Sequence, residues 1–183
     1  MNTKVLVLVS HPNIEDSRIN DALAKALEGN PLVTVRHIDQ QLTSGDSGFD
    51  AATEQAIIDA HEAIVLQFPW FWYSPPASLK KYLDDVLTPG WAYRGGNALE
   101  GKPVMAAIST GGPAEAYSSE GNNKFTMEQF LSPLIATANM TKMRWVDPFV
   151  IHGVRTLSDE ELEVAIEDYV ARIDGLVLEP SSV

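Results

Sequence analysis

Short apolar runs alternate with amphipathic segments five times along this chain of 183 residues. Continuous apolar runs, such as KVLVLV at Lys4–Val9 and AIVL at Ala63–Leu66, are typical of strands that are buried on both faces. The segments between them, such as Ala77–Leu87, have hydrophobic residues at helical spacing. This alternation predicts an α/β fold, in which a parallel sheet has helices on both faces and right-handed crossovers.

The expected strands are Lys4–Val9, Leu32–Ile38, Ala63–Leu66, Lys102–Ile108 and Lys142–Ile151. The expected helices are Ser17–Glu28, Asp50–Ala60, Ala77–Leu87, Phe125–Thr137 and Ser158–Leu176. We expect one domain over residues 1–183, with a disordered tail at 177–183. With the strand order 2-1-3-4-5, the loops after the first, third and fourth strands lie at one sheet edge, where such folds bind ligands.

Composition excludes several classes of protein. The net charge of −12 argues against binding to nucleic acid or to an anionic membrane surface. The chain has no cysteine, so it has no disulfide and no thiolate metal site, and no other metal site is predicted. Residues 1–9 pass directly into an apolar strand pattern, and no run approaches the roughly 20 apolar residues that span a bilayer. We therefore expect a cytoplasmic protein without an integral membrane segment.

An aromatic stretch follows the third expected strand. We expect the chain to break at Pro69 into a loop that carries Phe68, Trp70, Phe71, Trp72 and Tyr73. Prolines at both ends limit the conformations of such a loop, and a large apolar patch on a loop usually marks a ligand or a partner. The stretch predicts one wall of a pocket for a flat ligand. Alternatively, these side chains close the core or form a dimer contact.

The loop after the first strand has the sequence SHPNIEDSRIN and precedes a helix. Helix N-termini bind phosphate because they have free N–H groups and a partial positive charge. This loop also offers polar side chains from four residues: His11, Ser17, Arg18 and Asn20. It contains neither GxGxxG nor a P-loop motif. The interpretation is a phosphate site, although Ser17 could equally be a plain helix cap.

The fourth strand ends in the sequence STGGP, and Tyr117 follows in the same loop. Paired glycines let the backbone approach a ligand, and N–H groups there can stabilise negative charge on a reduced ring. Together, a phosphate site, an aromatic wall and a glycine turn at one edge fit the phosphate, ribityl chain and ring of a flavin mononucleotide.

The chain resembles the flavodoxin-like NAD(P)H:quinone oxidoreductases. This family includes small bacterial members and the ancillary flavoproteins of glutathione-gated potassium efflux systems. The resemblance lies in HPNIEDSRIN, in FPWFWYSPPASLKKYLDDVLTPGWAYR and in STGG followed by Tyr117, and it covers roughly residues 3–175. It implies a flavodoxin-like three-layer fold and a homodimer with the pocket at the subunit interface. It also implies ping-pong hydride transfer from NAD(P)H through the flavin to a quinone.

By this resemblance, the residues around the flavin phosphate are His11, Ser17, Arg18 and Asn20. Those along the ribityl chain and ring are Pro69, Trp70, Phe71, Trp72 and Tyr73. Those at the pyrimidine edge are Ser109, Thr110, Gly111 and Gly112, with Tyr117 over the pocket as a substrate-binding or catalytic residue. The cofactor is expected to be FMN, with FAD possible, because a short chain offers little surface for the adenosine of FAD.

One position departs from the family pattern. Animal members have a histidine after the tyrosine that matches Tyr117, thought to assist proton transfer, and Asn123 occupies that position here. Asparagine cannot hold a proton near neutral pH, so this relay is not expected. The other histidines, His37, His61 and His152, lack metal-ligand spacing and are expected to be structural or surface residues. Two other functions stay open: a regulatory subunit docked to a transporter, and a flavodoxin-type electron carrier.

Overall fold

The computed structural model describes residues 4–42 and 48–178. Five strands form one parallel sheet in the order β2-β1-β3-β4-β5. They are β1 Val5–Val9, β2 Val33–His37, β3 Ala63–Pro69, β4 Pro103–Ser109 and β5 Arg144–Ile151. The helices are α1 Arg18–Ala26, α2 Ala51–Asp59, α3 Ala77–Val86, α4 Met127–Met140 and α5 Asp159–Leu178. The predicted α/β fold and strand order are confirmed.

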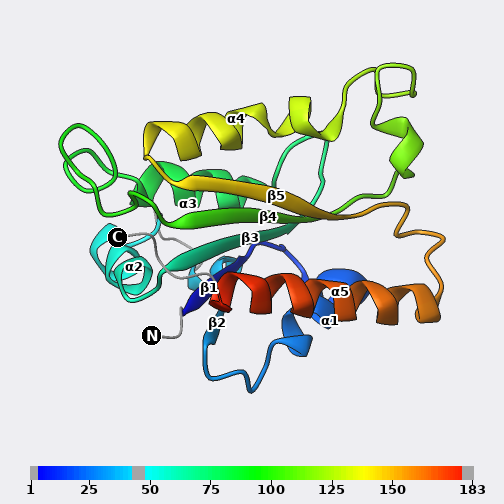
Figure 1. Ribbon diagram of the computed structural model, residues 1–183, viewed down its shortest axis with the longest axis horizontal. Helices are drawn as coiled ribbons and strands as arrows, with labels where there is room; N and C mark the ends of the chain where they lie inside the picture. Colours follow the sequence, from blue (N-terminus) through cyan, green and yellow to red (C-terminus); the bar gives the residue numbers. More distant parts are fainter. Residues whose placement is uncertain (1–3, 43–47, 179–183) are drawn as a thin grey trace.

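The helices form a layer on each face of the sheet (Figure 1). Side chains alternate between the two faces of a strand, and β1 shows this directly. Val5, Val7 and Val9 pack with the buried residues of α1 and α5. Leu6 and Leu8 pack with those of α2, α3 and α4. Because both faces of the central strands are buried, these strands are apolar along most of their length, which is the pattern that the sequence showed.

Side-chain caps set the starts of several helices. The Thr126 hydroxyl accepts a hydrogen bond from the Gln129 N–H, and the Gln129 side chain accepts one from the Thr126 N–H. Ser158 and Glu161 cap α5 in the same reciprocal way. Each such cap stabilises the helix by about 1 kcal/mol. Thr126 thus explains why α4 begins at Met127, two residues later than expected.

Two sequence expectations are wrong at element ends. Strand β3 continues through Pro69, because its last residues pair with β4 up to Ser109. Phe68 is therefore a fully buried strand residue and does not lie on a loop. Helix α5 extends through Leu178, because the buried Val177 still packs against the core. Residues 179–183 of the expected tail lie outside the described residues.

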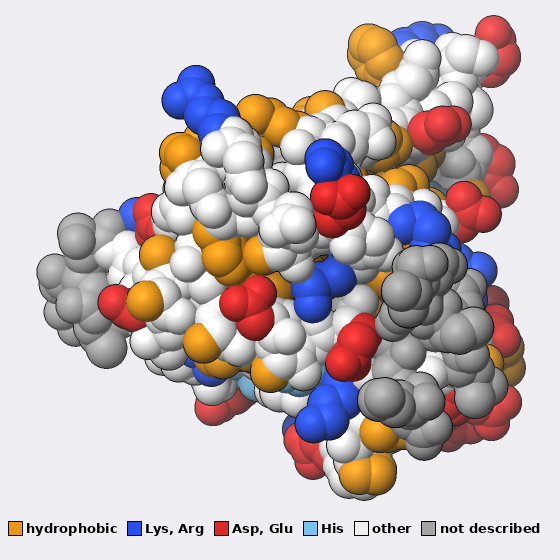
Figure 2. Space-filling model, turned by 60° about the vertical axis from the view of Figure 1, so that its left-hand side comes forward, with side chains coloured by type: hydrophobic (Ala, Val, Ile, Leu, Met, Phe, Trp, Pro, Cys, Tyr) orange, Lys and Arg blue, Asp and Glu red, His pale blue; other side chains and the backbone are white. Residues whose placement is uncertain are grey.

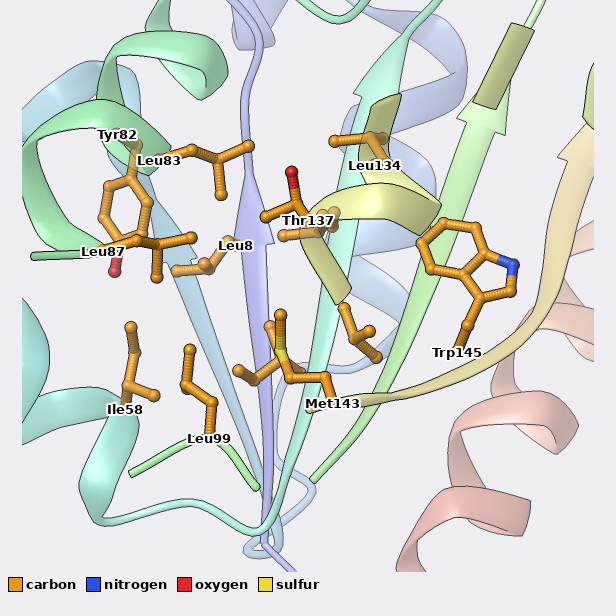
Figure 3. A pocket seen from close by; sticks show the side chains of 13 residues that line it. Leu8, Ile58, Tyr82, Leu83, Leu87, Leu99, Leu134, Thr137, Met143 and Trp145 are labelled. Carbon is orange, nitrogen blue, oxygen red and sulfur yellow. The ribbon is translucent and has the colours of Figure 1, made fainter. Parts of the chain in front are cut away.

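A small apolar cavity lies between the sheet and the helices α3 and α4 (Figure 3). Side chains from different elements point into it, including Leu8, Tyr82 and Leu134. Its volume of about 30 Å³ is close to the space of a single water molecule, so it cannot hold a planar cofactor.

The described residues include no helix that is both long and apolar enough to cross a bilayer. Figure 2 shows the end of the molecule opposite the carboxyl ends of the strands, where acidic, basic and hydrophobic side chains are interspersed.

Candidate functional site

The three loops singled out in the sequence meet at the carboxyl edge of the sheet. The Ser10 N–H donates to the Gln67 carbonyl at 2.9 Å, which joins the end of β1 to β3. The Trp70 N–H donates to the Ser109 carbonyl at 2.8 Å, and the Asn20 amide donates to the Ser109 hydroxyl at 3.0 Å. The start of α1 and the ends of β3 and β4 are therefore in direct contact.

The first turn of α1 is the candidate anion site. Ser17 caps the helix by accepting the Asn20 N–H at 3.1 Å. The N–H groups of Arg18 and Ile19 lie at the start of the helix, where no preceding turn supplies a carbonyl acceptor. They therefore point outward from the helix end. Asn20 is only 2% exposed, and its Oδ1 has no hydrogen-bond partner among the described residues. An unpaired buried acceptor costs about 1–3 kcal/mol, and a ligand hydroxyl at this position would satisfy it.

The side chain of Arg18 turns away from this anion site. Its Nη1 donates to the Leu157 carbonyl at 2.9 Å, and its Nη2 pairs with the Asp159 carboxylate at 2.5 Å. Only the backbone N–H of Arg18 is left for an anion at the helix terminus. The guanidinium instead ties the start of α1 to the loop before α5.

His11, a residue of the first loop, contacts the aromatic loop. Its backbone N–H donates to the Asp39 carboxylate at 2.8 Å, and its ring Nδ1 accepts the Asn13 backbone N–H at 3.1 Å. The neutral ring therefore has its proton on Nε2, where it can donate to a ligand. Burial lowers the pKa of His11, although Asp39 and Asp16 act in the opposite direction. The ring centroid lies 6.3 Å from that of Phe71, in an edge-on arrangement.

The aromatic loop is a tight turn. Phe71 and Ser74 exchange backbone hydrogen bonds of 3.0 and 3.1 Å. The two residues between them, Trp72 and Tyr73, have φ values of 47° and 62° in the left-handed region. Bulky residues rarely adopt this region, and such strain of about 1–3 kcal/mol per residue tends to occur at functional sites. The turn presents Trp72 at its tip, where the side chain is 94% exposed.

The aromatic side chains do not form one flat wall. Phe71 faces His11, whereas Tyr73 stacks on Phe130 of α4 at a centroid distance of 5.0 Å. Trp70 lies 6.2 Å from the same ring. The sequence analysis missed Phe130, which is the hub of this cluster. The signal that could have found it is an aromatic residue in the first turn of the helix that follows the glycine-turn loop.

Asn123 has a structural partner. The Tyr73 hydroxyl donates to its Oδ1 at 3.2 Å, which joins the aromatic loop to the loop between β4 and α4. Tyr117 lies on that same loop, 6.1 Å from the Phe130 ring centroid. Burial raises the pKa of Tyr117, so its hydroxyl remains a hydrogen-bond donor at neutral pH.

Thr110 is the centre of the glycine turn and is fully buried. Its hydroxyl donates to the Gly112 carbonyl at 2.8 Å and lies 3.0 Å from the His152 Nδ1. Because the single hydroxyl proton is used on Gly112, the Nδ1 of His152 must be the donor. His152 also lies 5.1 Å from the Tyr117 ring, and burial lowers its pKa. The expectation that this histidine has only a structural or surface role missed its contact with the site.

Neither glycine of the turn needs its conformational freedom, because neither Gly111 nor Gly112 has a left-handed φ. A Cβ atom at Gly112 would make ordinary contact with the Tyr117 ring at 3.5 Å, and one at Gly111 would lie 3.3 Å from Arg155. The absent side chains thus leave backbone atoms of the turn accessible between Tyr117 and Arg155.

A groove of about 420 Å³ adjoins the aromatic loop between α3 and α4. It extends from Trp70 and Tyr73 to Met140, and most of its lining is apolar. Lys80 and Asp84 contribute charges at its margin and pair with each other at 2.5 Å.

The sequence profile of a family described as having a flavodoxin-like fold matches residues 3–174. The chain belongs to this family. General stress protein 14 from Treponema denticola, solved in complex with FMN, is 34% identical, with a TM-score of 0.87 over 94% of this chain and 99% of the other. An NADPH-quinone reductase from P. pentosaceus is 30% identical, with a TM-score of 0.82 over 91% and 95% of the two chains.

The potassium-efflux system ancillary protein KefG from Pectobacterium carotovorum is 38% identical over 167 residues, which are 91% of this chain and 90% of that protein. The resemblance stated from the three motifs is therefore confirmed. Relatives of this chain include oxidoreductases and a protein solved with bound FMN.

Proposed function

We propose that the protein is an FMN-dependent NAD(P)H oxidoreductase that passes two electrons to quinones or similar acceptors. The observation that carries the proposal is the contact between the start of α1 and the glycine turn, made by Asn20 and Ser109. This contact joins the first turn of α1 to the glycine turn at one edge of the sheet, which supports a cofactor site there. The FMN complex of a relative that is 34% identical supports the choice of cofactor.

The residues present fit the chemical parts of FMN. The first-turn N–H groups of α1, the Ser17 hydroxyl and the Nε2–H of His11 would hold the phosphate. The unpaired Oδ1 of Asn20 would accept a hydrogen bond from a ribityl hydroxyl. Pro69, Phe71 and the backbone of Ser109–Gly112 would border the ring system. When bound, FMN supplies the acceptor for a hydride, and the protein supplies position and electrostatics.

Tyr117 would bind the substrate rather than relay a proton. Its raised pKa keeps it a donor, and Asn123 is held by Tyr73 and cannot take up a proton. Any proton that the acceptor requires would come from water.

The test is to reconstitute the purified protein with FMN and with FAD and to compare their affinities. NADPH or NADH is then added without oxygen, followed by a quinone, while the flavin absorbance is recorded. We expect bleaching by the nicotinamide and recovery with the quinone. Initial rates should give parallel double-reciprocal lines, as ping-pong transfer requires. A protein that binds neither flavin contradicts the proposal. Bound flavin that no nicotinamide reduces indicates an electron carrier instead.

A homodimer is part of the proposal. Trp72, which adjoins the groove residue Tyr73 in the chain, is 94% exposed, and Met140, which lines the groove, is 63% exposed. Exposed apolar surface of this kind usually marks an interface. Light scattering should give twice the chain mass, and Trp72→Asp should yield monomers. A monomeric parent protein contradicts this part.

The relative KefG favours a second candidate, a flavin-binding regulatory subunit of a potassium efflux transporter. Co-purification with a membrane transporter from the native organism, and a change in potassium flux when the protein is deleted, would support it. Normal flux in the deletion strain would exclude it.

A further inference from the structure

The loop that joins β5 to α5, residues 152–158, is attached to the glycine turn. The Val154 N–H donates to the Thr110 carbonyl at 3.0 Å, and the Gly153 N–H donates to the Gly112 carbonyl at 2.9 Å. The pairing between β4 and β5 thus continues past the last strand residues. Figure 1 shows this loop in orange beyond the carboxyl ends of the strands.

The other end of the loop is attached to the first turn of α1. Arg18 holds both the Leu157 carbonyl and the Asp159 carboxylate. Between these ties, Gly153 has a left-handed φ of 65°, and its carbonyl accepts the Thr156 N–H at 3.0 Å. The loop therefore connects the two halves of the candidate site and is restrained at both ends.

Arg155 occupies the middle of this loop and lies against Gly111. A Cβ atom on Gly111 would be 3.3 Å from its Nε and 3.6 Å from its Cζ. Within residues 4–42 and 48–178, no carboxylate forms a salt bridge with Arg155, whereas Arg18 and Arg36 are both paired. In a chain of net charge −12, an unpaired cation beside the glycine turn is available to an anionic group of a ligand.

We propose that Arg155 contacts the cofactor and offsets the negative charge that two-electron reduction adds to the ring at the glycine turn. This inference rests on the proposed function. A hydride brings two electrons and one proton, so a neutral ring that receives it gains one negative charge. An adjacent opposite charge stabilises the charged form of a group. Arginine remains protonated at every accessible pH, so its contribution does not depend on pH.

Two other groups, His152 and Arg18, do not provide this fixed charge. Burial lowers the pKa of His152, so its ring carries no fixed positive charge. The neighbouring Glu115 is an acid and offers no positive charge either. The Arg18 guanidinium is engaged by Asp159. Because the loop also contacts α1, the alternative partner of Arg155 is the cofactor phosphate, and the experiment distinguishes the two.

The experiment uses full-length protein loaded with FMN and the variants Arg155→Gln and Arg155→Lys. Anaerobic titration against a reference dye gives the midpoint potential, and fluorescence titration gives the dissociation constants of oxidised FMN and of riboflavin. We expect Arg155→Gln to lose about tenfold in its preference for reduced over oxidised FMN, which lowers the potential of a two-electron couple by about 30 mV. Arg155→Lys should retain most of the parent potential because it keeps the charge.

The matched control is Arg172→Gln. Arg172 lies on α5, 17 positions after Arg155 in the sequence, and donates to the Asp147 carbonyl at 2.6 Å. The change therefore removes one positive charge at a position distant from the glycine turn. Its potential should match that of the parent. An unchanged potential in Arg155→Gln overturns the inference. So does an equal loss of affinity for oxidised and reduced FMN with unchanged riboflavin binding, since that places Arg155 on the phosphate. A parent protein that binds no FMN overturns the proposed function as well.

Discussion

Tyr169→Phe tests a buried polar chain that links α5 to the candidate site. The Tyr169 hydroxyl donates to Gln67 Oε1 at 3.0 Å, and Gln67 Nε2 donates to the Asn20 carbonyl at 2.8 Å. Asn20 then donates to the Ser109 hydroxyl at 3.0 Å. None of these four residues is more than 6% exposed. Burial raises the pKa of Tyr169, so its hydroxyl stays protonated and donates.

The expected loss in the free energy of unfolding follows from Gln67 Oε1, which Tyr169→Phe leaves without a hydrogen-bond donor. Phenylalanine keeps the ring that packs against Phe149, so the change removes only the hydroxyl. Gln67 is fully buried, so water cannot replace the lost donor at Oε1. An unsatisfied buried acceptor costs about 1–3 kcal/mol. With a central cost of about 2 kcal/mol, a chain of this size should lose about 4–8 °C in Tm.

Urea unfolding, followed by circular dichroism and tryptophan fluorescence, measures the change in the free energy of unfolding. The control is Tyr93→Phe, because the Tyr93 hydroxyl has no hydrogen bond to any residue in the described part of the chain. In the double variant Tyr169→Phe/Gln67→Leu, the cost should be smaller than the sum of the single costs. A loss below about 0.5 kcal/mol for Tyr169→Phe, the range of ordinary surface changes, would refute the reasoning.

Three further predictions concern the site, the loops and pH. Phe71→Ala should weaken FMN binding by about 1 kcal/mol in fluorescence titration with little change in Tm, because the ring is 43% exposed and meets the His11 ring edge-on. Unchanged affinity would contradict its place beside the cofactor. Gly121→Ala should cost about 1–3 kcal/mol in urea unfolding, since its Cβ would lie 2.2 Å from the Glu115 carbonyl oxygen, and a neutral result would show that this loop relaxes freely. The free energy of unfolding should fall as the pH drops from about 7 to 5. Burial lowers the pKa values of His11 and His152 in the folded chain, so the unfolded chain binds more protons at these residues. His152→Gln should reduce this fall, and an identical pH profile would exclude a contribution of His152.

The sequence determined the architecture of this protein because the signals involved are local. Apolar runs such as Val5–Val9 are buried on both faces, and a strand of this kind requires helices above and below the sheet. Parallel strands place their carboxyl ends at one edge, so the order of strands brings the loops at His11, Phe71 and Gly111 together. The cap at Ser17 was also visible, since it depends on a residue only three positions away.

Only the tertiary structure decided how the side chains at that edge divide their contacts. His152 meets Thr110 across 42 positions, and Tyr169 meets Gln67 across 102. No periodicity or motif encodes such partners, because they depend on how two elements pack. For the same reason the sequence could not show that Arg155 lies against Gly111. Local spacing thus determined the framework, while packing between distant segments decided which groups face the site.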